Sequence, residues 1–154
     1  MKRFLLLLTM LVPMFGCANG RPGGQIVSYE YRYSGCMVHP IVSYELVRSA
    51  SGKQTLSYSH NDGVIHSVVL QEDALDKIDL MARRGRLCRL KERYTPLMRI
   101  LDGYTWSLRI SYERDSISSH GNNAYPSHRK WDVIEAINAY LEELIAGSAA
   151  PSEP

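Results

Sequence analysis

The chain has 154 residues, with 18 basic and 16 acidic side chains. Residues 1–16 contain two of the basic residues and no acidic one, so the remainder of the chain is formally neutral. Neutrality argues against general nucleic-acid binding and against polybasic attachment to anionic lipid, and this length suits one domain with one core.

The N-terminal segment has the organisation of an export signal. Lys2 and Arg3 are positively charged, and an almost unbroken apolar run follows from residue 4 to residue 15. A run of about twelve residues suits a signal peptide and falls short of the ~20 residues that a membrane-spanning helix needs. The run ends in the sequence M-F-G-C, and this ending resembles the lipobox of bacterial lipoproteins.

In a lipobox the cysteine is acylated, with fatty acids such as palmitate, and the peptide bond before it is cut. The resemblance therefore implies that residues 1–16 are a lipoprotein signal peptide and that Cys17 receives the lipid, although Phe15 is larger than the usual residue at its position. Two or three acyl chains anchor a protein firmly in a membrane. The alternative is an ordinary secretory signal that contains a cysteine. In the lipoprotein interpretation, residues 17–24 are the lipidated cysteine and a flexible tether.

Four strands are predicted in the first half of the domain, from an alternation of apolar and polar side chains with a period of two. Three tyrosines of the first strand share a face with Val27, which favours packing against a core. Asn61-Asp62-Gly63 is a tight-turn signal before the fourth strand. The first strand begins near Gln25, and the other three cover residues 42–48, 54–60 and 64–70. The three tyrosines of the first strand are Tyr29, Tyr31 and Tyr33.

A period of three to four residues then predicts a first helix. Its apolar stripe runs from Ala74 to Ala82, with acidic residues before it and Gly85 after it. Residues 87–93 form a short helical piece or a loop. The alternation with period two returns at residues 104–113 and predicts a further strand.

A last helix begins after Ser127, which can cap it, and ends at Gly147, so that residues 148–154 form a disordered tail. One-sided apolar strands in this order predict an α+β fold, an antiparallel sheet of about five to six strands with two helices packed on one face. The single domain covers residues 25–147. The other face of the sheet is then polar and open to solvent or to a partner.

Cys36 and Cys88 remain as thiols once Cys17 is lipidated. Outside the cytoplasm they can form one disulfide, which closes a loop of about fifty residues. Two buried free thiols are the alternative, because cysteine is among the residues most often buried.

Several short segments are characteristic of the chain. Residues 106–113 have the sequence W-S-L-R-I-S-Y-E, and residues 117–126 have the sequence I-S-S-H-G-N-N-A-Y-P. Residues 35–40 are G-C-M-V-H-P, and residues 137–144 are I-N-A-Y-L-E-E-L. Together with the lipobox they resemble a family of small uncharacterised lipoproteins, a domain of unknown function common in anaerobic gut bacteria. The resemblance implies an envelope-facing domain and no established activity. Some of those proteins carry an acidic stretch after the cysteine that directs them to the cell surface, and residues 18–21 here are not acidic.

The sequence contains no recognisable catalytic or metal-binding motif. The five histidines are dispersed, and none forms a pair at the i, i+4 spacing of a helical metal site. Ser119 and His120 are adjacent, but neighbours on an extended chain point to opposite faces, and no nucleophile elbow is present. We therefore expect no metal, no cofactor and no enzymatic activity.

Residues 117–126 are the candidate binding loop. Serine, glycine and asparagine offer donors and acceptors there, an aromatic residue supplies an amphipathic anchor, and Pro126 fixes the entry into the last helix. An ordered turn that only positions this helix is the alternative. The candidate binding residues are Ser119, His120, Asn122, Asn123 and Tyr125.

These patterns predict an exported protein that is attached by lipid to a membrane of the cell envelope, with the outer membrane favoured over the inner. Its domain is expected to bind another envelope protein without catalysis, and nucleic acid is not an expected partner. A glycan-binding or glycan-processing accessory lipoprotein is the alternative, because tyrosines are abundant and aromatic side chains are common on binding surfaces.

Overall fold

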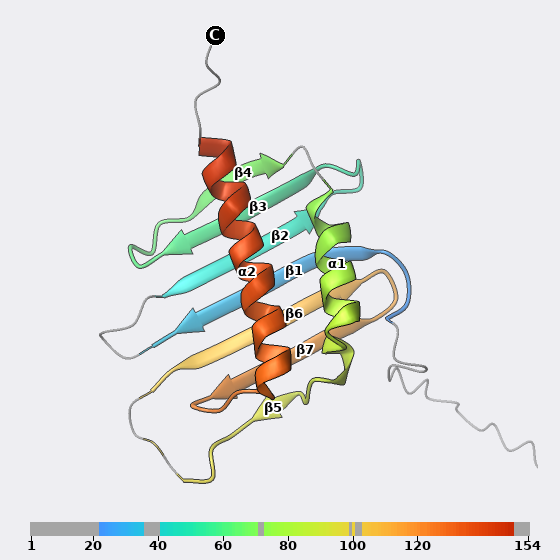
Figure 1. Cartoon of the computed structure of the whole chain (residues 1–154). Helices are drawn as coiled ribbons and strands as arrows, with labels where there is room; N and C mark the ends of the chain where they lie inside the picture. The colour runs from blue at the N-terminus through green and yellow to red at the C-terminus, as the bar shows by residue number, and fades with distance from the viewer. Residues whose placement is uncertain (1–21, 36–40, 71–72, 99, 101–102, 150–154) are drawn as a thin grey trace, which may run out of the picture.

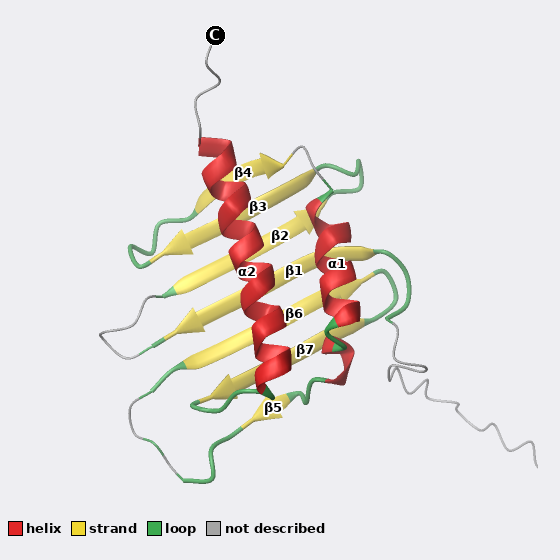
Figure 2. Cartoon of the chain, in the orientation of Figure 1, coloured by secondary structure: helices red, strands yellow, loops and turns green. Residues whose placement is uncertain are grey.

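A computed structural model describes residues 22–35, 41–70, 73–98, 100 and 103–149. Seven strands form one sheet, and two α-helices lie on the same face of it (Figures 1 and 2). This is the predicted α+β architecture. The elements are β1 (Ile26–Ser34), β2 (Val42–Arg48), β3 (Gln54–His60), β4 (His66–Leu70), α1 (Ala74–Arg84), the short 3-10 helix η2 (Leu87–Arg89), β5 (Arg93–Tyr94), β6 (Thr105–Tyr112), β7 (Ser116–Asn122) and α2 (His128–Ala149).

The strands lie in the order β4-β3-β2-β1-β6-β7-β5, so the first strand in the sequence is at the centre of the sheet. Neighbouring strands are antiparallel except β5, which pairs in parallel with β7. The connections β1–β2, β3–β4 and β5–β6 therefore lie at one end of the strands. Residues 22–25 lie at the opposite end, where they contact the β6–β7 turn (Figure 1).

The core lies between the sheet and the two helices. α2 crosses the strands from β7 to β4, and α1 lies beside it (Figure 1). Full burial of one large apolar side chain contributes about 1.5–3 kcal/mol, so this layer supplies most of the hydrophobic stabilisation. The fully buried side chains include Tyr29, Leu46, Leu56, Leu75, Ile78, Leu108, Ile110, Ile134, Ile137 and Leu141.

β1 contains an irregularity that simple alternation does not predict. Its register against β6 shifts between Ile26 and Ser28, as at a β-bulge. Ile26 is 1% exposed and joins the core, whereas Val27 is only partly buried. A single extra residue reverses which side chains face the core, so the bulge places Ile26 where Val27 was expected.

The N-terminus of α1 is held by side chains from the neighbouring strands. The buried Gln54 in β3 accepts a hydrogen bond from the backbone N–H of Leu75 at 3.0 Å and donates one to Asp73. Arg48 in β2 contacts Asp73 at 2.5 Å and Asp76 at 2.8 Å. The first backbone N–H groups of a helix have no partner within the helix, so Gln54 does here what a local cap usually does.

The structure agrees with most of the predicted boundaries and adds two strands. β2 and β3 have the predicted bounds, and α2 begins directly after Ser127. β7 occupies most of the segment that was interpreted as a loop, and the two-residue β5 was also not predicted. α2 continues past Gly147 to Ala149, because one glycine costs a helix only about 1 kcal/mol and does not by itself end it.

Some of the predicted features fall outside the described residues. Cys17 and Cys36 are among them, so lipidation and the disulfide stay predictions. Cys88 lies in η2, partly buried against the core. Within the described part of the chain, no helix is both long enough and apolar enough to cross a membrane.

Candidate functional site

The five candidate binding residues do not form one loop. Ser119, His120 and Asn122 belong to β7, and Asn123 and Tyr125 follow it. The expectation of a continuous recognition loop is therefore wrong. β7 has few of the β-branched and aromatic residues typical of strands, and it is a strand because β6 pairs with it along its length.

Alternation along β7 sends these side chains to opposite faces of the sheet. Ser119 is 1% exposed on the helix side, and its hydroxyl donates to the backbone carbonyl of Lys91 at 2.7 Å. His120 and Asn122 are exposed on the other side. Ser119 and His120 thus point apart, and this arrangement does not place a histidine base beside a serine hydroxyl.

Asn123 has a structural role at the end of β7. Its φ of 48° lies in the left-handed region that asparagine tolerates better than most residues. Its side-chain carbonyl accepts a hydrogen bond from the backbone N–H of Tyr104 at 3.0 Å, which ties the β5–β6 connection to the turn after β7. Asn123 therefore orders the chain before Tyr125.

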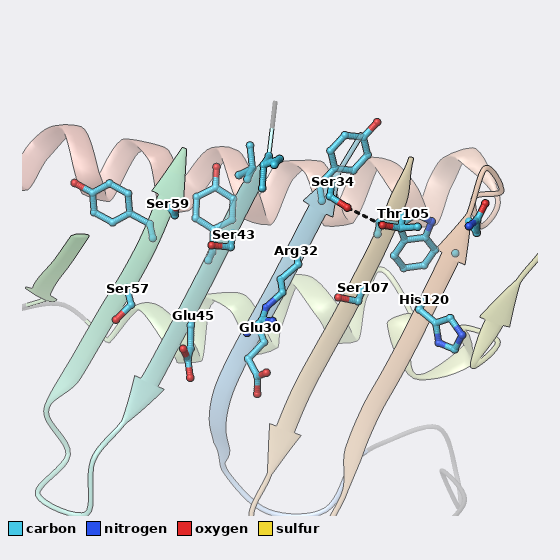
Figure 3. Close-up of a pocket in the computed structure, with 18 of the residues that line it drawn as sticks. Glu30, Arg32, Ser34, Ser43, Glu45, Ser57, Ser59, Thr105, Ser107 and His120 are labelled. Atoms are coloured by element: carbon cyan, nitrogen blue, oxygen red, sulfur yellow. Dashed lines mark hydrogen bonds between the residues drawn. The ribbon is translucent and has the colours of Figure 1, made fainter. Parts of the chain in front are cut away.

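A hollow of about 750 Å³ lies on the face of the sheet opposite the helices, and we call it the open-face groove. Figure 3 shows its polar side chains, which come from β3, β2, β1, β6 and β7. A smaller hollow on the same face, of about 370 Å³, shares part of this lining and adds Arg109. The polar lining of the groove includes Glu30, Arg32, Ser43, Glu45, Ser57, Ser107, His120 and Asn122.

Charge changes sign across the open face. Glu45 lies on β2, Glu30 and Arg32 lie on β1, and Arg109 lies on β6. Glu30 is directly opposite Glu45 on one side and Arg109 on the other. No ion pair in the described part of the chain involves any of these four side chains. The open face therefore carries neighbouring acidic and basic side chains that form no ion pair within the described part of the chain.

Apolar side chains border the groove at one end of the strands. Ile41 and Ile65 line it and are 54% and 75% exposed. Leu97 and Met98, on the β5–β6 connection at the same end, are still more exposed. Exposed apolar side chains gathered at one end of a molecule are a usual mark of an interaction site.

A second hollow, of about 470 Å³, lies on the helix side between α2 and the strands β1 and β2. We call it the aromatic groove. Tyr125, the predicted anchor, is 37% exposed there, and its ring meets Trp131 edge to face with the centroids 4.5 Å apart. The complete lining is Tyr31, Tyr33, Val42, Tyr44, Tyr125, Trp131, Glu135 and Asn138.

The polar groups along this face of α2 are oriented by aromatic partners. The indole N–H of Trp131 donates to Glu135 Oε1 at 2.7 Å, and the Tyr29 hydroxyl donates to Asn138 Oδ1 at 2.8 Å. Further along α2, Glu142 accepts hydrogen bonds from the Tyr44 hydroxyl and lies 2.7 Å from His60 Nε2. Sequence analysis did not single out these α2 residues, although Glu135, Asn138 and Glu142 share the spacing of one helix face.

Burial raises the pKa of Tyr31 and of Tyr44 in the aromatic groove. It raises the pKa of Tyr31 well above the ordinary value for tyrosine. Burial also raises the pKa of Tyr44, with a further contribution from the hydrogen bond to Glu142. Both hydroxyls therefore stay protonated at neutral pH and are able to donate hydrogen bonds.

No family model matches the chain, and no curated protein matches it. The geometry of the two grooves is consequently the basis for a function. Within the described residues, no cluster of three or more histidine, cysteine, aspartate or glutamate side chains is arranged to hold a metal ion. What both grooves offer is binding chemistry, namely charges, hydroxyls, amides and aromatic rings.

Proposed function

We propose that this protein is an exported, lipid-anchored binding protein of the cell envelope, and that the open-face groove binds another envelope protein without catalysis. One observation carries the proposal. The groove holds charges of both signs without partners in the described part of the chain, and Ile41 and Ile65 lie exposed on its border.

The charge pattern favours a protein as the partner. Glu30 and Glu45 disfavour a polyanion, and Arg32 and Arg109 disfavour a polycation. Protein surfaces carry both signs, and complementary charges set the orientation of a partner and accelerate its association. The exposed isoleucines supply apolar area that a protein partner can bury.

The size of the open face also fits. Six strands about 4.8 Å apart and about seven residues long present a face of roughly 650–700 Å². Each partner in a standard protein interface contributes about 800 Å². The face and its apolar border together approach that area.

The position of the N-terminal segment leaves this region accessible. Residues 23 and 25 bond to the β6–β7 turn, at the end of the strands opposite the β3–β4 connection, which contains Ile65. Four residues separate Cys17 from residue 22, so the Cα atoms of the two are at most about 18 Å apart, whereas β1 is about 30 Å long. An anchor at Cys17 would therefore hold the domain by the end remote from the apolar border.

Site-specific photocrosslinking in intact cells tests the protein-binding proposal. A photoreactive phenylalanine analogue is placed at Ile65, and in a matched control at Leu80, which is 48% exposed on α1 away from the groove. We expect one recurrent adduct at position 65, weakened by Arg32→Glu together with Arg109→Glu. Arg84→Glu, on the exposed surface of α1, is the charge control. No adduct at position 65, or the same adducts at both positions, would contradict the proposal.

Membrane attachment is tested separately. Cys17→Ser removes the thiol that would be acylated, so we expect the variant to leave the membrane fraction, whereas wild type stays in it. Fractionation followed by immunoblotting measures this distribution. If Cys17→Ser remains with the membranes, the lipoprotein assignment fails.

A further inference from the structure

The aromatic groove combines partly exposed aromatic rings with a few oriented polar groups. We infer that it is a carbohydrate-binding site that takes a pyranose ring of a neutral glycan, stacked on the exposed ring of Tyr125 and hydrogen-bonded by Glu135 and Asn138. The linings of the two grooves share Tyr33, Val42 and Tyr44, whereas Tyr125, Trp131, Glu135 and Asn138 line the aromatic groove and not the open-face groove. This inference therefore goes beyond the proposed protein-binding function, and it is tested on Tyr125, a residue that the open-face groove does not use.

The aromatic wall is rigid and partly exposed. Tyr33 stacks on Tyr104 with the ring centroids 6.0 Å apart, and Tyr104 in turn contacts Tyr125 at 6.0 Å. Tyr125 meets Trp131, whose ring packs edge to face on the buried Trp106 at 5.4 Å. These contacts fix the rings before a ligand arrives, so a sugar that stacks on them orders few side chains. Tyrosine and tryptophan present an apolar body with a polar tip, which matches a pyranose ring with its apolar C–H face and peripheral hydroxyls.

The polar wall has unused hydrogen-bonding capacity. One oxygen of Glu135 accepts from the Trp131 indole, and its other oxygen makes no hydrogen bond with the described residues. The Asn138 carbonyl accepts from the Tyr29 hydroxyl, which leaves the amide N–H₂ available within the same part of the chain. Residues three apart on a helix lie about 5–6 Å from each other, a spacing at which one acceptor and one donor can bond neighbouring ring hydroxyls.

Charge and size restrict the ligand class. Glu135 is the charged residue of the lining, and the lining contains no lysine, arginine or histidine, so phosphorylated or acidic sugars are disfavoured. The volume of about 470 Å³ lies within the ~300–1,000 Å³ of small-molecule sites. A neutral sugar meets both conditions.

Binding is measured with the mature, lipidated protein in a zwitterionic detergent that carries no sugar. The probes are glucose, galactose, mannose and N-acetylglucosamine, each as the monosaccharide and as a short oligosaccharide. Tryptophan fluorescence follows binding, because the protein has two tryptophans and Trp131 lines the groove. Saturation-transfer NMR identifies the bound sugar. Binding of monosaccharides indicates a free-sugar ligand, and binding of oligosaccharides alone indicates a polymer.

Three variants at tyrosine positions test the site. We expect Tyr125→Ala to weaken binding by about tenfold or more, and Tyr125→Phe, which retains the ring, to bind nearly as wild type. Tyr58→Ala removes a partly buried tyrosine outside the groove and is expected to leave binding unchanged. The inference is overturned if no probe gives saturable binding up to about 10 mM, or if Tyr58→Ala and Tyr125→Ala lose affinity equally. Either failure would leave the crosslink expected at position 65 untouched.

Discussion

Glu45 and Leu46 are neighbours in β2, yet one side chain is exposed on the open face and the other is fully buried beneath the helices. The same contrast extends over the sheet. The covered face carries aromatic and aliphatic residues, and the open face carries serines and charges. Apolar burial on one face supplies the stability of the domain, so residues of the other face are released from packing and available for recognition.

Alanine substitutions at Leu46 and at Glu45 test the contrast between the two faces most directly. Leu46→Ala should lower the free energy of unfolding by about 2–5 kcal/mol, because it leaves a cavity in the core. Glu45→Ala should change the free energy of unfolding by no more than about 0.5 kcal/mol. Guanidinium denaturation followed by circular dichroism measures both. Comparable losses in the two variants would show that the open face also holds the fold together.

A methyl group added at Gly121 tests how tightly the covered face is packed. A Cβ there would lie 2.2 Å from the Ala124 carbonyl oxygen and 2.3 Å from Trp106 Nε1, and the Trp106 indole N–H donates a hydrogen bond to that oxygen. Gly121→Ala should therefore cost about 1–3 kcal/mol. Gly147→Ala is the control, because nothing lies within 4 Å of a Cβ at that position of α2. It should stabilise by up to about 1 kcal/mol, and thermal unfolding distinguishes the two signs.

Gln54→Ala tests the role of a buried polar residue that bonds to the N-terminus of α1 on the covered face. The substitution leaves the backbone N–H of Leu75 and the carboxylate of Asp73 without this partner, so we expect a loss of about 1–2 kcal/mol in the free energy of unfolding. Hydrogen exchange should show faster opening at the N-terminus of α1 than elsewhere. Thr55→Ala, the next residue in β3, serves as the control. Equal losses in both variants would contradict a capping role for Gln54.

The smallest expected effect concerns the loss of folding stability at low pH. The Arg48 guanidinium, which donates a hydrogen bond to Asp76, holds the pKa of that carboxyl below its ordinary value of 3.8. A lowered pKa contributes stability that is present above the unfolded-state value and is lost as the pH falls through the folded-state value. Wild type should thus lose more stability than Asp76→Asn as the pH falls from about 5 to about 2, by less than about 1 kcal/mol because the aspartate is exposed.

Denaturation at a series of pH values measures that difference. Asp132→Asn, at an exposed aspartate of α2 that contacts His128, is the matched control. We expect its acid dependence to follow wild type. If both variants flatten the acid dependence equally, the contact with Arg48 is not its cause.

Local periodicity was enough to predict the covered face and most of the elements. The apolar residues from Ala74 to Ala82 and those that alternate in β6 each bury one side of one element. Such a pattern can be recognised within a single segment. The bulge at Val27 and the strand conformation of β7 were not predicted from local periodicity. Both arise from pairing with β6, a strand distant from β1 in the sequence.

The candidate site shows the same limit more strongly. Tyr125 was identified as an aromatic anchor, but its companions Trp131, Glu135 and Asn138 come from α2 and its walls include Tyr33 and Tyr44. No sequence motif links these residues, because the groove exists only where α2 crosses the ends of β1 and β2. His120 and Asn122 were likewise named for a loop and instead line the opposite, open face.

The sequence by itself determined the class of fold, the apolar face of each helix and most strand boundaries, since these depend on the spacing of side chains along one segment. Only the tertiary structure decided that β1 is central, that charges of β2, β1 and β6 lie side by side, and that aromatic rings from four separate segments meet under α2. Strand order and helix placement depend on contacts between distant segments, and a local pattern carries no information about which segment its partner will be.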